Sequence, residues 1–158
     1  MILTKIQESA ANYPDDIAIQ FKEGDQYRKY AYRELVANIA SVARALSRLG
    51  IGKGDRVAVL SENRPEWVIS YLSITSLGAV VVPLDAQLTD KEVSLLLSNC
   101  DAKAVCVSAG TRQKLPSGKA ITVISYDPGD GVLFSEMMLV DPGAPMPAAP
   151  LDSDLAAI

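Results

Sequence analysis

Three short runs of apolar residues constrain the fold of this chain more than any other feature of its sequence. They lie at residues 56–60, 79–82 and 104–107, and none of them alternates polar with apolar side chains. A strand without such alternation is buried on both faces, which is typical of a parallel sheet covered by helices. The segments between the runs have helical features, so strands and helices alternate along the chain. The sequence therefore predicts an α/β fold with a mostly parallel sheet flanked by helices.

Helical periodicity is clearest at residues 33–49. Apolar side chains recur there at steps of four and three and form one face, and Gly50 follows at the position where a left-handed residue ends many helices. A second helix, at 65–77, begins with proline and is apolar nearly all round, which is typical of a buried helix. Thr89 and Glu92 have the spacing of a capping box, which predicts that a third helix begins there.

The amino-terminal segment has weaker patterns. Residues 4–13 are predicted to form a short helix, and two extended runs at 17–21 and 27–32 flank a polar turn. This arrangement predicts an N-terminal β-hairpin. Residues 121–124 form another short apolar run. We expect the apolar run at 79–82 to be a strand that Pro83 ends.

The chain divides into three parts by composition. Residues 1–140 are predicted to form one N-terminal α/β subdomain, because the strand and helix patterns continue through them. Residues 141–153 contain four prolines and predict a connecting loop. Residues 154–158 are mostly apolar and are predicted to be the start of a truncated strand, since natural chain ends are usually polar. We therefore expect the chain to be cut within a larger domain.

Charge and composition exclude several functions. The net charge is −4, with 19 acidic against 15 basic residues, so no nucleic-acid partner is expected. The sequence has no apolar run of about 18 residues and no secretory signal, so no membrane span is expected either. Two cysteines without metal-type spacing, Cys100 and Cys106, favour a cytoplasmic location. The absence of histidine excludes His-based catalysis within the chain and most zinc sites.

Two glycine-containing segments do not match the phosphate-binding motifs that they superficially resemble. The segment Gly50-Ile-Gly52-Lys-Gly54 follows a helix and precedes a strand, whereas the dinucleotide fingerprint requires the reverse order. The segment 110–119 has the wrong spacing for a P-loop, and Ala120 stands where a serine or threonine is needed. From the residues alone, the chain has no complete active site, no catalytic residue and no metal site.

Three stretches in series resemble the adenylate-forming (AMP-binding) superfamily. They are Tyr30-Ala-Tyr-Arg-Glu-Leu35, the segment from Gly50 through Asp55-Arg-Val-Ala-Val-Leu60 to Asn63-Arg-Pro-Glu-Trp67, and Leu77-Gly-Ala-Val-Val-Val-Pro-Leu-Asp85. The family includes acyl-CoA synthetases, aryl-CoA ligases, luciferases and peptide-synthetase adenylation domains. The resemblance implies that this chain is part of the larger N-terminal domain of such an enzyme.

The resemblance also implies ligands for the parent enzyme: ATP, Mg²⁺, a carboxylic acid and CoA. The family's phosphate-binding loop follows a strand that resembles residues 154–158. The resemblance therefore implies that this chain lacks the catalytic motifs, and we expect it to be inactive alone.

Four residues are candidates for binding CoA by the same resemblance. In CoA-using relatives, CoA approaches the turn that corresponds to Ala86 and Gln87 and the basic segment that corresponds to Arg112 and Lys114. The two cations are suited to pair with the 3′-phosphate of CoA. The alternative is that they are ordinary solvated charges on a loop.

Two other functions remain open. The parent enzyme is either a CoA ligase or an adenylation domain that loads a carrier protein. Alternatively, the chain is a stand-alone, non-catalytic interaction module, whose uncovered apolar face would promote self-association. One departure from the family concerns helix capping: Ala31 stands three residues before Glu34, where relatives usually carry threonine or serine, so half of a capping box is missing.

Overall fold

The structure is a computed structural model that describes residues 2–118 and 120–140. The predicted connecting loop at 141–153 and the predicted strand start at 154–158 lie outside the described residues.

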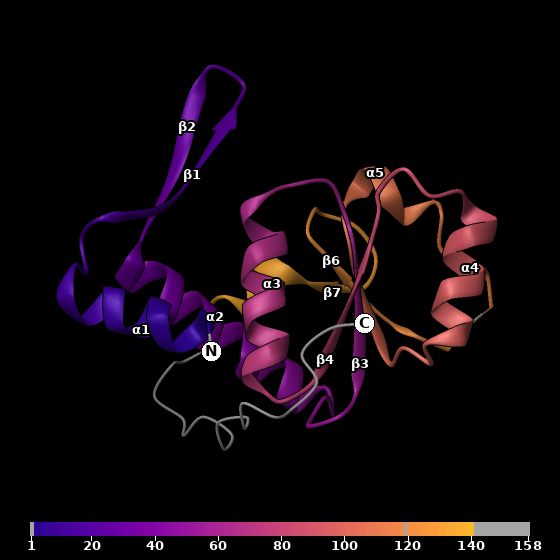
Figure 1. Ribbon diagram of the computed structural model, residues 1–158. Coiled ribbons are helices and arrows are strands. Elements are labelled where there is room, and N and C mark those ends of the chain that lie inside the picture. The colour runs from indigo at the N-terminus through magenta and orange to yellow at the C-terminus, as the bar shows by residue number, and fades with distance from the viewer. Residues whose placement is uncertain (1, 119, 141–158) are drawn as a thin grey trace.

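A five-stranded sheet forms the centre of the fold, with the strand order β4-β3-β5-β6-β7 (Figure 1). Every neighbouring pair of strands in it is parallel. The strands are β3 (Arg56–Leu60), β4 (Val80–Leu84), β5 (Ala104–Val107), β6 (Thr122–Ser125) and β7 (Val132–Leu133). The predicted α/β fold with a mostly parallel sheet is confirmed.

Helices cover both faces of this sheet, with α2 and α3 on one side and α4 on the other (Figure 1). Residues of β3 alternate between the faces: Val57 and Val59 join the apolar cluster beneath α2 and α3, whereas Ala58 and Leu60 join the cluster beneath α4. β3 is therefore buried on both sides, as its unbroken apolar sequence requires. The helices are α1 (Ile2–Asn12), α2 (Tyr32–Arg48), α3 (Pro65–Ser76), α4 (Asp90–Asn99), α5 (Ala109–Arg112) and α6 (Phe134–Met137).

The predicted N-terminal hairpin is confirmed as β1 (Ile17–Glu23) and β2 (Gln26–Ala31), which pair antiparallel. It projects away from the sheet, beyond α1 and α2 (Figure 1). A side-chain contact ties it to the rest of the fold: Arg28 Nη2 donates to Glu66 Oε1 of α3 at 2.6 Å. Only half of the capping box at Ala31 is formed. Glu34 Oε2 accepts the N–H of Ala31 at 2.8 Å, but the alanine methyl group cannot accept a hydrogen bond in return.

The prediction that Pro83 ends its strand is wrong. Pro83 lies inside β4, paired with Val59 of β3. Proline lacks an N–H, but among the described residues β4 is an edge strand of the sheet, where one side of the backbone needs no partner. The elements α5, β7 and α6 were not predicted, because α5 and α6 are one turn long, too short to show helical periodicity, and β7 has only two residues.

The glycine-rich segment before β3 is a turn. Gly54 has φ of 81°, a conformation that favours glycine, and its N–H donates to the Gly78 carbonyl at 2.9 Å. Asp55 fixes the turn, because its Oδ2 accepts the N–H of Gly52 at 2.8 Å and its Oδ1 lies 2.8 Å from Lys103 Nζ. This turn stands at the amino end of β3, at the edge of the sheet opposite the segments that follow the strands.

Candidate functional site

The segments that follow the parallel strands meet at one edge of the sheet. We call this the carboxyl edge and define it as residues 61–64, 85–87, 108–114 and 126–127, which follow β3, β4, β5 and β6 respectively. The chain runs from β3 to β4 on one side and later places β5 on the other side of β3, so the strand order reverses at β3. In open α/β sheets, ligands usually bind outside the carboxyl ends of the strands near such a reversal.

A buried hydroxyl pair anchors α5 to the end of β3. The Ser108 Oγ donates to Glu62 Oε2 at 2.6 Å, and Ser108 itself is fully buried. The Thr111 hydroxyl donates to the Leu60 carbonyl at 2.6 Å and accepts the N–H of Ser108 at 3.2 Å. The bonds to Glu62 and Leu60 thus join the segment after β5 to the end of β3 and to the segment that follows it.

Arg64 and Asp127 connect the same region to the segment after β6. Arg64 Nη1 lies 3.0 Å from both carboxylate oxygens of Asp127, and Arg64 Nε donates to Glu66 Oε2 at 2.8 Å. Asp127 Oδ2 also accepts the N–H of Ala109, the first residue of α5, at 2.8 Å. The guanidinium of Arg64 lies 5.5 Å from the ring centroid of Tyr126, within the range of a cation–π contact.

These contacts shift the pKa values of the charged groups. Burial raises the pKa of Asp127, but hydrogen bonds from the Ala109 N–H and from Arg64 outweigh it and hold the pKa below its usual value. Burial likewise raises the pKa of Glu66, and the hydrogen bond and charge of Arg64 reverse the direction. Both carboxylates are therefore ionised at neutral pH and serve as acceptors rather than as general acids.

Three of the four predicted CoA-binding residues come together. Lys114 Nζ donates to the Ala86 carbonyl at 2.5 Å, which links the segment after β5 to the turn after β4. The N–H of Gln87 donates to Asp85 Oδ1 at 2.8 Å, so this turn is held by its own carboxylate. A pocket of about 450 Å³ is lined by Gln87, Leu88, Thr89, Asp90, Gln113 and Lys114.

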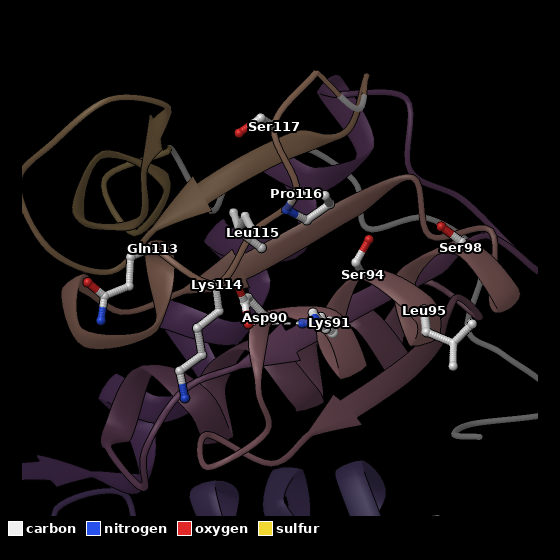
Figure 2. Close-up of a pocket in the computed structure, with 10 residues that line it drawn as sticks. All are labelled: Asp90, Lys91, Ser94, Leu95, Ser98, Gln113, Lys114, Leu115, Pro116 and Ser117. Atoms are coloured by element: carbon white, nitrogen blue, oxygen red, sulfur yellow. Dashed lines mark hydrogen bonds between the residues drawn. The ribbon is translucent and has the colours of Figure 1, made fainter.

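A second pocket, of about 620 Å³, adjoins the first, since both include Asp90, Gln113 and Lys114 in their walls. Figure 2 shows Gln113 and Lys114 at one end of it and Leu95 and Ser98 of α4 at the other. Leu95 is 60% exposed, so part of this wall is apolar and open to solvent. Ala86 lines neither of these pockets but a third one, of about 380 Å³, together with Trp67, whose ring stacks on Tyr71.

The fourth predicted residue, Arg112, is placed differently. It is half-buried on α5 and lines neither of the two pockets beside Lys114. Its Nη1 is buried without a hydrogen-bond partner in the described part of the chain. The structure therefore groups Lys114, Ala86 and Gln87 and leaves Arg112 apart from them.

Sequence reasoning did not identify Arg64, Ser108, Thr111 or Asp127. The available signal was their position, because each follows an apolar run that forms a strand with its carboxyl end at this edge. Within residues 2–118 and 120–140, no three His, Cys, Asp or Glu side chains cluster as metal ligands would. Across the same residues, no helix has the length and apolar character needed to cross a membrane.

The known proteins that are similar to this chain include an acyl-carrier-protein ligase and a putative acyl-CoA synthetase. A fatty acid–[acyl-carrier-protein] ligase, MmaC of Mycobacterium marinum, is 32% identical over 99% of this chain and 30% of its own length. A putative acyl-CoA synthetase, YngI of Bacillus subtilis, is 31% identical over 65% of this chain and 18% of its own. The chain thus spans less than a third of the length of these relatives.

Solved structures agree with this comparison. A fatty acyl CoA synthetase of Mycobacterium tuberculosis superimposes with a TM-score of 0.82 at 27% identity, over 99% of this chain and 32% of the other. The N-terminal subdomain of NpsA from Klebsiella oxytoca gives a TM-score of 0.79 at 26% identity, over 99% of this chain and 37% of the other. The family model described as AMP-binding enzyme matches residues 6–158, nearly the whole chain. This chain therefore belongs to the AMP-binding enzyme family.

Proposed function

We propose that the chain is the amino-terminal portion of an ATP-dependent acyl-CoA synthetase. In that reaction, a carboxylate oxygen attacks the α-phosphorus of ATP, which forms acyl-AMP and releases pyrophosphate. The sulfur of CoA then attacks the acyl carbon, so that a C–S bond forms, the C–O bond to phosphate breaks and AMP leaves. We assign the chain a part in receiving the thiol and no part in the first step.

The observation that carries this assignment is the contact between Lys114 and Ala86. An ammonium group has three N–H donors, and the Ala86 carbonyl occupies one of them. The remaining donors are available to a phosphate of CoA at the rim of the two adjoining pockets. The backbone of the Ala86–Gln87 turn lies at the same place, so one lysine brings both predicted contact segments to one ligand.

ATP and Mg²⁺ are expected ligands of the complete enzyme. We assign neither of them to side chains of this chain. At the carboxyl edge, Arg64 and Asp127 are occupied with each other, and Arg64 also pairs with Glu66 of α3. The chain's own contribution is to build and hold the edge at which the thiol arrives.

A carrier protein in place of CoA is the second candidate function. It is favoured by the similarity to MmaC, a ligase named for an acyl-carrier protein, which extends over 99% of this chain. A pantetheine thiol is common to both acceptors, so the Ala86–Gln87 turn would serve either. The acceptors differ in the nucleotide 3′-phosphate, which CoA has and a carrier protein lacks.

The first experiment is to read the coding sequence beyond Ile158 and express the complete protein. We expect acid-dependent exchange of pyrophosphate into ATP, followed by thioester formation with CoA. Transfer to a carrier protein with no transfer to CoA would establish the second candidate. A stop codon directly after Ile158 would overturn both, and the stand-alone interaction module, tested by self-association in light scattering, would replace them.

Lys114→Ala tests the residue assignment within that enzyme. We expect the KM for CoA to rise about tenfold, equivalent to about 1.4 kcal/mol of lost binding. Lys103→Ala is the matched control, because Lys103 Nζ also donates to a backbone carbonyl, that of Gly50 at 3.4 Å, but at the opposite edge of the sheet. Equal effects of the two variants on the KM for CoA would contradict the assignment.

A further inference from the structure

The segment that carries Lys114 has little stability of its own. Its only helix, α5, has four residues, and one turn of isolated helix is strongly disfavoured in water. Lys114 follows two residues after the end of α5. Its position at Ala86 therefore depends on whatever holds α5 against the sheet.

Asp127 supplies one of those anchors at the first residue of α5. Its Oδ2 accepts the Ala109 N–H at 2.8 Å, a backbone donor that no bond within the helix can satisfy. Arg64 in turn fixes the carboxylate, with Nη1 at 3.0 Å from both oxygens. The side chain of Arg64 is only 15% exposed and that of Asp127 is 29% exposed, so solvent screens this pair less than a surface ion pair.

Neither residue touches the place where the thiol substrate is expected. Neither Arg64 nor Asp127 is among the residues lining the two pockets beside Lys114. The contact through which this pair can act on the thiol is the one from Asp127 to the backbone of α5.

We infer that Arg64 and Asp127 are positioning residues, which hold α5 against the sheet so that Lys114 stands beside the Ala86–Gln87 turn. The inference rests on the proposed function. It adds that thiol binding depends on two side chains, one from the segment after β3 and one from the segment after β6.

Asp127→Asn in the complete ligase is the test, and Asp55→Asn is its matched control. Asp55 has the same chemistry, since it accepts a backbone N–H at 2.8 Å and pairs with a cation, Lys103, and its side chain is 23% exposed. It lies at the opposite edge of the sheet. Both variants should lower the melting temperature, but only Asp127→Asn should raise the KM for CoA, by about fivefold, which is within the range of coupling through a packed network.

A double-mutant cycle separates positioning from general destabilisation. If Asp127 acts through Lys114, Asp127→Asn adds no further rise in the KM for CoA when Lys114 is already alanine. A full fivefold rise in that background would overturn the inference. So would equal KM values for CoA in Asp127→Asn and Asp55→Asn.

Amide hydrogen exchange gives a readout that does not depend on the thiol reaction. Peptides spanning residues 109–116 should exchange faster in Asp127→Asn than in Asp55→Asn. If the amides of residues 109–116 exchange as slowly in Asp127→Asn as in the wild type, the positioning role of Asp127 is overturned, even if Lys114 binds CoA. Conversely, if Lys114→Ala leaves the KM for CoA unchanged while the exchange differs as expected, the assignment of the thiol to Lys114 fails and the anchoring of α5 stands.

Discussion

Replacing Glu66 by glutamine removes a negative charge on which two guanidinium groups converge. Arg28 Nη2 lies 2.6 Å from Glu66 Oε1, and Arg64 Nε lies 2.8 Å from Oε2. The Glu66 side chain is 6% exposed, so water does not replace the lost charge. Glutamine keeps the size of the side chain, and the change therefore tests the charge rather than the packing.

The expected loss of stability follows from the partners that remain. Removing one member of a buried ion pair typically costs about 3–5 kcal/mol, because the other charge is left uncompensated. Here Arg64 keeps Asp127, and the side chain of Arg28 is 33% exposed. We therefore expect a smaller loss, about 2–3 kcal/mol, which lowers the melting temperature by about 5–10 °C in a chain of this size.

Circular dichroism melts over a range of pH provide the assay. Burial raises the pKa of Glu66, but the hydrogen bond from Arg64 and the charges of Arg64 and Arg28 lower it below its ordinary value of 4.5. A carboxylate with a lowered pKa in the folded state stabilises the fold above its unfolded-state pKa, and this contribution is lost as pH falls through the folded-state pKa. The difference in melting temperature between the wild type and Glu66→Gln should thus be largest near pH 7 and shrink below about pH 4.5.

Glu8→Gln is the control for this experiment. Glu8 lies 2.8 Å from Lys5, but the two side chains are 53% and 77% exposed, so we expect a change within about 0.5 kcal/mol. A Glu66→Gln variant that melts together with Glu8→Gln, or a difference from wild type that does not change with pH, would refute the reasoning.

Three further predictions concern the backbone and the core. Ala31→Thr should stabilise the fold by about 0.5–2 kcal/mol, because a threonine hydroxyl can complete the half-formed capping box; an unchanged or lowered melting temperature would contradict this. Gly131→Ala should destabilise it by about 1–3 kcal/mol in urea unfolding, since φ is +107° and an added Cβ would stand 2.7 Å from the Val123 carbonyl oxygen. Its control is Gly52→Ala, where an added Cβ meets nothing within 4 Å, and which should stay within about 0.5 kcal/mol of wild type. Cys106 is 1% exposed and burial raises its pKa to about 12, so iodoacetamide at pH 8 should label it only when the chain unfolds; rapid labelling of the native chain would count against this core.

Strands formed by continuous apolar runs, and a helix that begins with a capping box, could be predicted from the sequence. The runs at 56–60 and 104–107 are β3 and β5 with the same bounds, because an apolar run between turns has few other uses in an α/β fold. The capping box at the start of α4 is also confirmed, since the N–H of Thr89 donates to Glu92 Oε2 at 2.8 Å. The position of Pro83 was misjudged because proline is excluded only from inner strands, and the sequence pattern did not show that β4 is an edge strand.

The candidate site was predictable only in part. The resemblance to the AMP-binding family placed Lys114 and the Ala86–Gln87 turn in one region, and the structure brings them into contact. Their role in binding CoA stays a prediction. Arg64 and Asp127 are 63 residues apart, and their pairing depends on which strands are neighbours. Local patterns do not specify strand order, so this pair could not be found from the sequence.

The place of β3 in the sheet has a consequence for how the chain folds. β3 is synthesised before the other four strands, yet it lies between β4 and β5, and its last residue, Leu60, pairs with Leu84 and with Val107. Each pairing closes a loop of more than twenty residues, and such non-local contacts slow folding. On the ribosome, β3 cannot gain its second neighbour until Val107 has left the exit tunnel. During that interval one backbone edge of β3 is unpaired, and an unpaired strand edge makes a folding intermediate prone to aggregation.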